Sequence, residues 1–130
     1  MNRRVVAACI GASLAGSGGT PAHSAEEALY PAAQCAAYWL GRDDFARGSA
    51  YLDSDPTDPD RAAAFRAVAV RLNGGNAAPI DAFIATERDA MSPMVEAALY
   101  GDKISDRLQR RLLTICDTFA ATQDETRDLR

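Results

Sequence analysis

Apolar residues recur at helical spacing along most of the chain. They repeat every three or four positions in segments separated by short breaks rich in Gly, Pro and Asp, a pattern typical of amphipathic helices joined by turns. No segment shows convincing alternation of β-branched residues, which would indicate a strand. The sequence therefore predicts an all-α fold, a small compact bundle of three to five helices. The clearest stripe follows Asp102, a suitable helix cap, and repeats at four, four, three and four positions: Ile104, Leu108, Leu112, Ile115 and Phe119.

Proline, glycine and aspartate residues set the expected bounds of the first two helices. Pro31 suits a first helical position and Gly41 suits a C-terminal cap, with one further turn expected before Gly48. Asp58 is suited to cap a second helix, which continues through residues 61–72 and ends at a glycine pair. Both helices are rich in alanine, so the core must be built mainly from small and aliphatic side chains.

A third helical stripe extends from Pro79 to Tyr100. Pro93 interrupts it, and proline removes one backbone hydrogen bond from a helix. We therefore expect a kink at Pro93 or a break into two short helices. Gly101 ends this segment.

The first 24 residues have the layout of a secretory signal peptide. Arg3 and Arg4 precede an apolar run over residues 5–15, and small residues lead to a cleavage site after Ser24, with Ala25 as a close alternative. The run is too short for a membrane-spanning helix, which needs roughly 20 apolar residues. We expect a periplasmic or secreted protein with no stable membrane insertion; a disordered cytosolic tail is the alternative interpretation.

The mature chain is expected to be a single helical domain over residues 25–121, followed by a flexible tail over residues 122–130. Two cysteines remain in it, Cys35 and Cys116. In an oxidising compartment such a pair most simply forms one disulfide, here between the first helix and the last. Its closed loop would stabilise the fold by roughly 4.5 kcal/mol in the chain-entropy treatment. Functional thiols are the alternative, although redox pairs usually lie close together in sequence.

Charge and composition exclude several classes of function. The 130 residues carry 14 Lys and Arg against 18 Asp and Glu, a formal net charge of -4. Removal of residues 1–24 takes away Arg3, Arg4 and His23, so the mature chain has a net charge of -6 and no histidine. This excludes Ser-His-Asp and Cys-His catalysis and histidine metal sites. The acidic excess argues against nucleic acid or an anionic membrane as partner.

Two clusters resemble metal sites without completing one. An Asp-rich turn contains four carboxylates, but the EF-hand pattern fails because Asp58 stands where glycine is needed and Ala64 where glutamate should bind calcium. We interpret it as a proline-stiffened loop. Met91 and Met94 offer soft sulfur ligands for Cu(I), yet two ligands make a poor site and core packing is the simpler interpretation. We therefore predict no metal and no cofactor. The four carboxylates belong to Asp53, Asp55, Asp58 and Asp60.

Carboxylate catalysis is the one acid–base route left open. Glu87 falls on the apolar stripe of the third helix, where burial would raise the pKa of its carboxyl group. No partner carboxylate at fixed spacing accompanies it, and a side chain there often reaches out to water. No catalytic residue is assigned.

The densest aromatic stretch offers a possible partner surface, because aromatic residues often anchor protein interfaces. They equally suit the filling of an alanine-rich core. The residues are Tyr38, Trp39, Phe45 and Tyr51.

The general plan, a small exported helical domain held by one disulfide, is similar to that of the HdeA-type acid-stress periplasmic chaperones. The likeness is one of plan: no motif residues match, and the two cysteines here lie much further apart in sequence. It implies an ATP-independent holdase whose acidic groups are neutralised at low pH, releasing hydrophobic surface. The sequence pI of about 4.9 permits such behaviour.

We therefore expect a non-enzymatic exported protein that acts on another envelope protein. A chaperone and an inhibitor are the two more specific versions of this hypothesis. A helical bundle that binds a small ligand or a metal is the alternative. A carboxylate-dependent hydrolase is the third possibility.

Overall fold

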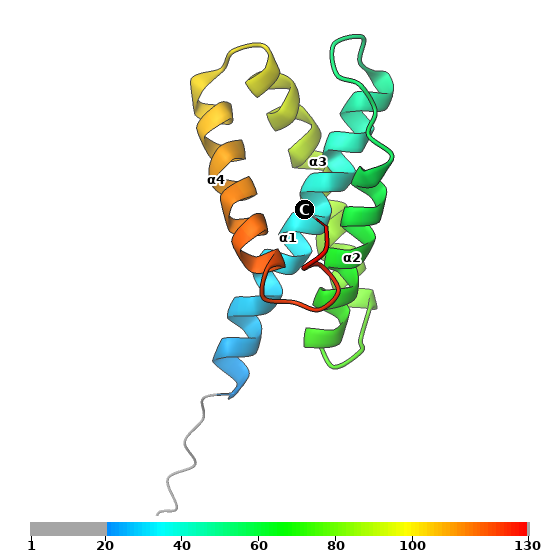
Figure 1. The fold of residues 1–130 in the computed structure, drawn as a ribbon, viewed down its shortest axis with the longest axis vertical. Helices are drawn as coiled ribbons and strands as arrows, with labels where there is room; N and C mark the ends of the chain where they lie inside the picture. The colour runs from blue at the N-terminus through cyan, green and yellow to red at the C-terminus, as the bar shows by residue number, and fades with distance from the viewer. Residues whose placement is uncertain (1–20, 130) are drawn as a thin grey trace, which may run out of the picture.

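The computed structural model describes residues 21–129 of the chain, and of residues 21–30 only the backbone. Within that range there are four helices and no strand, which confirms the predicted all-α bundle. The predicted signal peptide falls largely on residues 1–20, outside the described residues. None of the described helices combines the length and apolar character needed to cross a membrane. In chain order the helices are α1 (Pro21–Gly48), α2 (Thr57–Leu72), α3 (Ala78–Leu99) and α4 (Lys103–Ala120), as Figure 1 shows.

The central helix of the bundle is α1. It contacts α2 and α3 extensively and α4 over a smaller area. Its middle section is buried on every side, as expected of a helix that neighbours surround. Small side chains there allow the neighbouring helices to approach closely. The buried residues of this section are Ala32, Ala33, Cys35, Ala36, Ala37 and Tyr38.

The helix α1 begins at Pro21 and contains both Pro31 and Gly41. The predictions that Pro31 begins the helix and that Gly41 caps it are therefore wrong, while the expected extension to Gly48 is correct. Gly41 is buried at the place where α1 crosses α3. A β-carbon on it would lie 2.5 Å from Cβ of Met91 and 3.0 Å from the backbone nitrogen of Ser92. The glycine is therefore required for close helix packing, which local sequence signals do not distinguish from a helix end.

Two further helix boundaries differ from expectation. Asp58 does not cap α2, because the helix starts at Thr57 and the Asp58 side chain turns inward. The carboxylate of Asp55 instead accepts hydrogen bonds from the Thr57 backbone nitrogen at 2.9 Å and hydroxyl at 2.7 Å. Pro93 lies within α3, which continues unbroken from Ala78 to Leu99. Of the two expected outcomes, the break into two short helices is therefore wrong, and the kink stays a prediction.

Other helix ends follow the sequence. Asp102 caps α4, and its carboxylate accepts a hydrogen bond from the Ser105 backbone nitrogen at 2.7 Å. Gly74 and Gly75 end α2 with φ angles of 66° and 86°, values that glycine adopts without steric cost. Gly101, with φ of 92°, makes the turn between α3 and α4.

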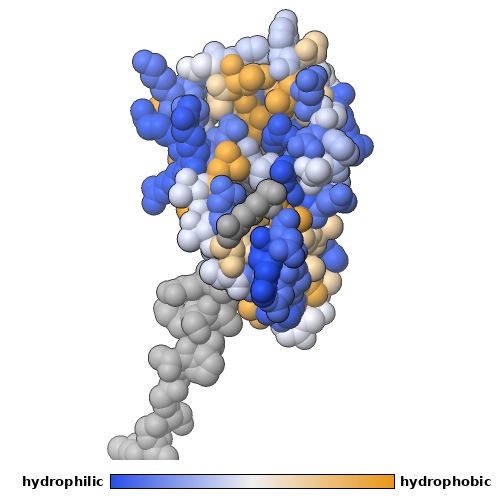
Figure 2. All heavy atoms as spheres, in the orientation of Figure 1, coloured by the Kyte–Doolittle hydropathy of each residue, from blue (hydrophilic) through white to orange (hydrophobic). Residues whose placement is uncertain are grey.

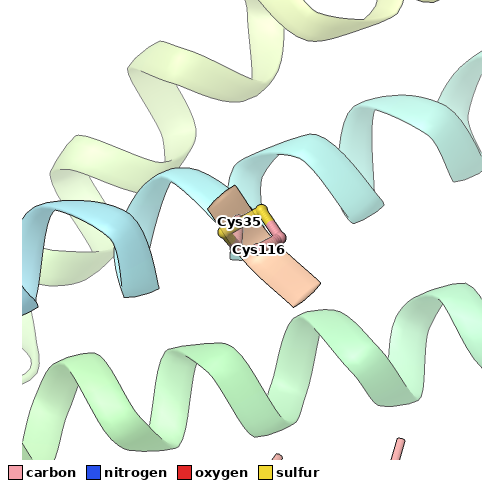
Figure 3. The surroundings of a disulfide bond; sticks show 2 residues. All are labelled: Cys35 and Cys116. Atoms are coloured by element: carbon pink, nitrogen blue, oxygen red, sulfur yellow. A yellow bond between two sulfur atoms is a disulfide. The ribbon is translucent and has the colours of Figure 1, made fainter. Parts of the chain in front are cut away.

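A disulfide joins Cys35 of α1 to Cys116 of α4, as predicted (Figure 3). The two Cα atoms lie 5.7 Å apart and 81 positions separate the residues in sequence. Both cysteines are buried. The bond therefore holds α4 against the central helix from inside the core.

Residues 121–129 form turns that fold back toward α2 (red in Figure 1). Thr126 is fully buried, and its hydroxyl donates to the Ala120 carbonyl oxygen at 2.9 Å. Arg71 of α2 donates to the Glu125 carboxylate at 2.6 Å. The contacts that hold this segment to the bundle are thus polar. The flexibility predicted for residues 122–130 stays a prediction.

Candidate interaction surface

The apolar stripe of α4 divides into a buried half and an exposed half. Successive residues of an α-helix are about 100° apart around the axis, so Ile104, Leu108 and Ile115 fall within a sector of about 40°. All three are exposed; Ile104 retains 61% of its surface and Leu108 54%. We call these three residues the α4 ridge. The sector beside it is buried and contains Leu112, Cys116 and Ala120.

Two bonds to α1 fix which half of the stripe faces the core. The disulfide holds Cys116 against Cys35. About two helical turns toward the N-terminus, Gln109 donates from Nε2 to the Tyr38 hydroxyl at 3.1 Å. Burial of Tyr38 raises the pKa of its hydroxyl, and the hydrogen bond from Gln109 partly offsets this. Because both contacts lie to one side of the apolar stripe, the α4 ridge is turned out of the core.

A second exposed apolar group lies at the same end of the bundle as the start of α4. Tyr100, in the α3–α4 turn, meets Tyr51 from the α1–α2 loop edge to face, with ring centroids 6.0 Å apart. Leu99 beside them is also exposed. We call Tyr51, Leu99 and Tyr100 the tyrosine tip. Figure 2 shows an apolar area bordered by hydrophilic residues. It lies toward the end of the molecule that carries the α1–α2 loop and the α3–α4 turn in Figure 1.

Cations border the α4 ridge on its solvent side. Arg111 lies three positions after Leu108 and four before Ile115, and Arg107 lies one turn earlier. Neither arginine has a hydrogen bond or ion pair with another described residue. The pKa of the Asp102 carboxyl group is lowered mainly by its hydrogen bonds from Ser105, and the positive charge of Arg107 adds a small electrostatic contribution. Like charges four apart on a helix are destabilising. The ridge is therefore apolar on its crest and positively charged along one edge.

The four aromatic residues singled out in the sequence occupy different environments. Tyr38 is buried at 1% exposure, while Trp39 and Phe45 are half-buried. Tyr38 and Trp39 meet edge to face, with centroids 5.0 Å apart. Tyr51 is 73% exposed and belongs to the tyrosine tip. The structure does not bring the four together on one surface.

Sequence reasoning identified the apolar stripe of α4 but did not predict that the α4 ridge is exposed. Helical periodicity identifies an apolar face but not the neighbours that cover it. The width of the stripe gave no signal, because the sector from Ile104 to Cys116 covers about 120°, which is ordinary for a helix face that packs on a core.

A cleft of about 600 Å³ lies on another side of the molecule, between α1, α2, α4 and the C-terminal segment. Trp39 lines it, and the Arg61 guanidinium lies 4.7 Å from the centre of the Trp39 ring. The Trp39 indole nitrogen is buried and has no hydrogen-bond partner in the part of the chain that the structure describes. The remaining lining residues include Phe65, Cys116, Asp117, Thr118, Thr126 and Leu129.

The Asp-rich turn is held by arginines. Asp58 is fully buried, and its carboxylate pairs with Arg42 of α1 and, at 3.2 Å, with Arg61. Arg61 also lies 3.5 Å from the Asp55 carboxylate. Asp53 is exposed. These contacts join α1 to the start of α2.

The other residues considered for chemistry lie in α3. Met91 is buried against the core and Met94 is half-buried, while Glu87 is half-buried on the same helix. Among residues 31–129, whose side chains the structure describes, no group of three or more His, Cys, Asp or Glu residues is arranged to hold a metal ion.

Comparison with protein-family models, with curated proteins and with solved structures found no match to this chain.

Proposed function

We propose that this is an exported, non-enzymatic helical protein that binds another envelope protein through the α4 ridge and the tyrosine tip. The observation that carries the proposal is the exposure of large apolar side chains in neighbouring positions at one end of the bundle, led by Ile104, Leu108 and Tyr100. Contiguous apolar surface rimmed by polar residues marks interaction sites in soluble proteins.

The build of this surface supports a protein partner. Tyrosine and arginine are enriched at binding hot spots, and Tyr51, Tyr100, Arg107 and Arg111 are all exposed here. The ridge lies on a helix tied to the core by a disulfide, so little conformational freedom is lost when a partner docks. Export is supported by the signal-like N-terminus and by a disulfide, which persists in oxidising compartments.

Capture from the host envelope tests this proposal. The tagged mature protein and an Ile104→Asp/Leu108→Asp variant are compared with Ala85→Asp, a control that adds a charge at an exposed position of α3. We expect the wild type and the control to retain the same protein and the ridge variant to lose it, because two carboxylates would be desolvated at the contact. Retention by the ridge variant, with its fold verified by circular dichroism, would reject the proposal.

The chaperone form of this proposal has its own test. A holdase would suppress light scattering by an aggregating client at acidic pH, and the ridge variant would protect less well. If the protein protects no client from aggregation, the chaperone form of the proposal is rejected, and an inhibitor or a structural binding protein is left.

A second candidate, a small-ligand-binding bundle, rests on the Trp39 cleft. Its volume of about 600 Å³ lies within the usual range of ligand sites. Trp39 lines it and has a buried indole nitrogen with no hydrogen-bond partner among the described residues. Native mass spectrometry of protein purified from its host would detect a bound mass, which a Trp39→Phe substitution should weaken. A wild-type protein free of any adduct would count against this candidate.

A further inference from the structure

We infer that the partner presents an amphipathic helix with acidic residues beside its apolar ones, and that this helix lies along the α4 ridge. The inference rests on the proposed function and specifies the chemistry of the partner. It is argued from the shape of the ridge and from the charges along its edge.

The ridge has the shape of a helix-docking surface. The ends of the ridge, Ile104 and Ile115, lie eleven residues apart on one helix, a length of about 16 Å and three turns. Side chains spaced three and four apart form ridges that fit the grooves of a second helix. An extended peptide would instead add to a sheet edge, and the described part of the chain contains no strand.

The charges along the ridge differ in sign from those of the whole chain. The protein has a net charge of -4, yet α4 carries four basic residues against two acidic ones. Arg110, on the side of α4 away from the ridge, is neutralised by Asp106 at 2.9 Å. Arg107 and Arg111, next to the ridge, have no such partner among residues 31–129, whose side chains the structure describes. Acidic residues on a docked helix would supply the missing charge complementarity.

A second copy of this chain fits the ridge less well. A two-fold dimer places the same patch on both subunits, so the pair Arg107 and Arg111 would meet its own copy. Like charges brought together at an interface cost several kcal/mol.

An anionic lipid surface also fits less well. Asp102 and Glu96 flank the turn that carries Tyr100, and both would approach the headgroups together with the tyrosine tip. Their repulsion, added to that of the whole chain, opposes the attraction of the two arginines.

The test uses synthetic helical peptides as probes. One peptide of about 18 residues, long enough to form a helix in solution, carries leucines at positions three and four apart with glutamates beside them. A matched peptide has glutamine at each glutamate position. We expect the glutamate peptide to bind the disulfide-intact protein about tenfold more tightly by fluorescence anisotropy, since two charge pairs would form. Raising the salt concentration should reduce this difference.

Paired variants assign the effect to the ridge. Arg107→Gln/Arg111→Gln should bring the glutamate peptide to the affinity of the glutamine peptide. Arg110→Gln, a loss of the same charge on the far side of α4, should leave the tenfold preference unchanged. Thermal melting confirms that the double variant remains folded, and the loss of like-charge repulsion should leave its stability the same or slightly higher.

Several results would overturn the inference: equal binding of both peptides, no binding of either, ridge-dependent dimerisation in sedimentation analysis, or ridge-dependent binding to phosphatidylglycerol vesicles. These outcomes are separate from failure of the proposed function. If Ile104→Asp/Leu108→Asp abolishes capture of an envelope protein while neither peptide binds, the interaction surface stands and only the acidic-helix partner is rejected.

Discussion

Gly41 sets the distance between α1 and α3 where the two helices cross. A methyl group at this position would lie 2.5 Å from Cβ of Met91 and 3.1 Å from the Arg88 carbonyl oxygen. A backbone carbonyl in a helix cannot move aside independently of that helix. Any side chain at position 41 would therefore push α1 and α3 apart.

Gly41→Ala should lower the free energy of unfolding. Overpacking costs about 1–3 kcal/mol, and replacing glycine by alanine in a helix returns about 1 kcal/mol, so we expect a net loss of up to about 2 kcal/mol in urea denaturation. Gly48→Ala is the matched control, because a β-carbon there meets no atom within 4 Å; its effect should stay within about 0.5 kcal/mol. Equal stability of the two variants would contradict this account.

Asp58 provides a second prediction at the scale of a single residue. Its carboxylate is fully buried between Arg42 and Arg61. Asp58→Asn preserves the shape but leaves both guanidinium groups without their counter-charge. Removing one partner of a buried ion pair costs about 3–5 kcal/mol. We expect roughly 3 kcal/mol, the lower end, because both arginines keep part of their surface in water.

Denaturation of Asp58→Asn beside Asp60→Asn measures this contribution. Asp60 is exposed on the same helix turn, so its substitution should change stability by no more than about 0.5 kcal/mol. Losses of similar size in both variants would show that the buried pair has no special role.

The sequence could not predict the position of Asp58, because the residues that compete for the carboxylate are remote. Asp58 precedes Pro59, a combination typical of a helix cap. Its actual partner, Arg42, lies sixteen positions earlier on another helix. Local sequence signals favour a hydrogen bond between the Asp58 carboxylate and a nearby backbone amide. The ion pair with Arg42 forms only because α1 packs on α2.

At the scale of elements, α4 depends on the disulfide more than α2 or α3 does. It buries only Leu112, Cys116 and Ala120 fully, and its contact with α1 is smaller than that of α2 or α3. Phe119 adds a stacked contact with Phe65 of α2, with ring centroids 6.5 Å apart. Loss of the bond should therefore affect α4 first.

Cys35→Ser/Cys116→Ser tests this dependence. We expect the free energy of unfolding to fall by roughly 4.5 kcal/mol, the loop-closure value for 81 positions. Hydrogen exchange should accelerate most over Lys103–Ala120 and least over α1–α2. An equal increase across all four helices would contradict a local role for the bond and favour a purely global one.

The same helix marks the limit of prediction from periodicity. The three- and four-residue repeats correctly predicted helices at all four places, because period and capping residues are local properties. They did not predict which sector of α4 faces the core. That choice is made by Cys116 and Gln109, which bond to α1, and their partners are 81 and 71 positions away.

At the scale of the whole molecule, surface ion pairs connect elements that are distant in sequence. Arg88 of α3 donates to Asp44 of α1 at 2.5 Å. Arg66 of α2 donates to Asp81 of α3 at 2.6 Å. Arg71 of α2 binds Glu125 of the C-terminal segment, also at 2.6 Å. Each pair has little effect alone when exposed, but together they link all parts of the bundle except α4.

These pairs give stability a defined dependence on pH. The arginine hydrogen bonds lower the pKa of Asp44, Asp81 and Glu125 below their ordinary values of 3.8 for aspartate and 4.5 for glutamate. A carboxyl group with a lowered pKa in the folded state stabilises the fold above its unfolded pKa, and this contribution is lost as pH falls through the folded pKa. The melting temperature should therefore stay level from pH 7 to about 5 and fall below about pH 4.5.

A variant with the three carboxyl groups neutralised separates this cause from general acid unfolding. Asp44→Asn/Asp81→Asn/Glu125→Gln should melt at a lower temperature at pH 7 and lose less on acidification, because its inter-element pairs are already absent. Thermal melts of both proteins between pH 7 and pH 2 give the comparison. Parallel curves would mean that other carboxylates govern the acid response. If the curves converge at low pH, the three inter-element pairs account for the acid sensitivity, because their contribution is lost once the carboxyl groups are protonated, while the apolar core shared by the four helices remains.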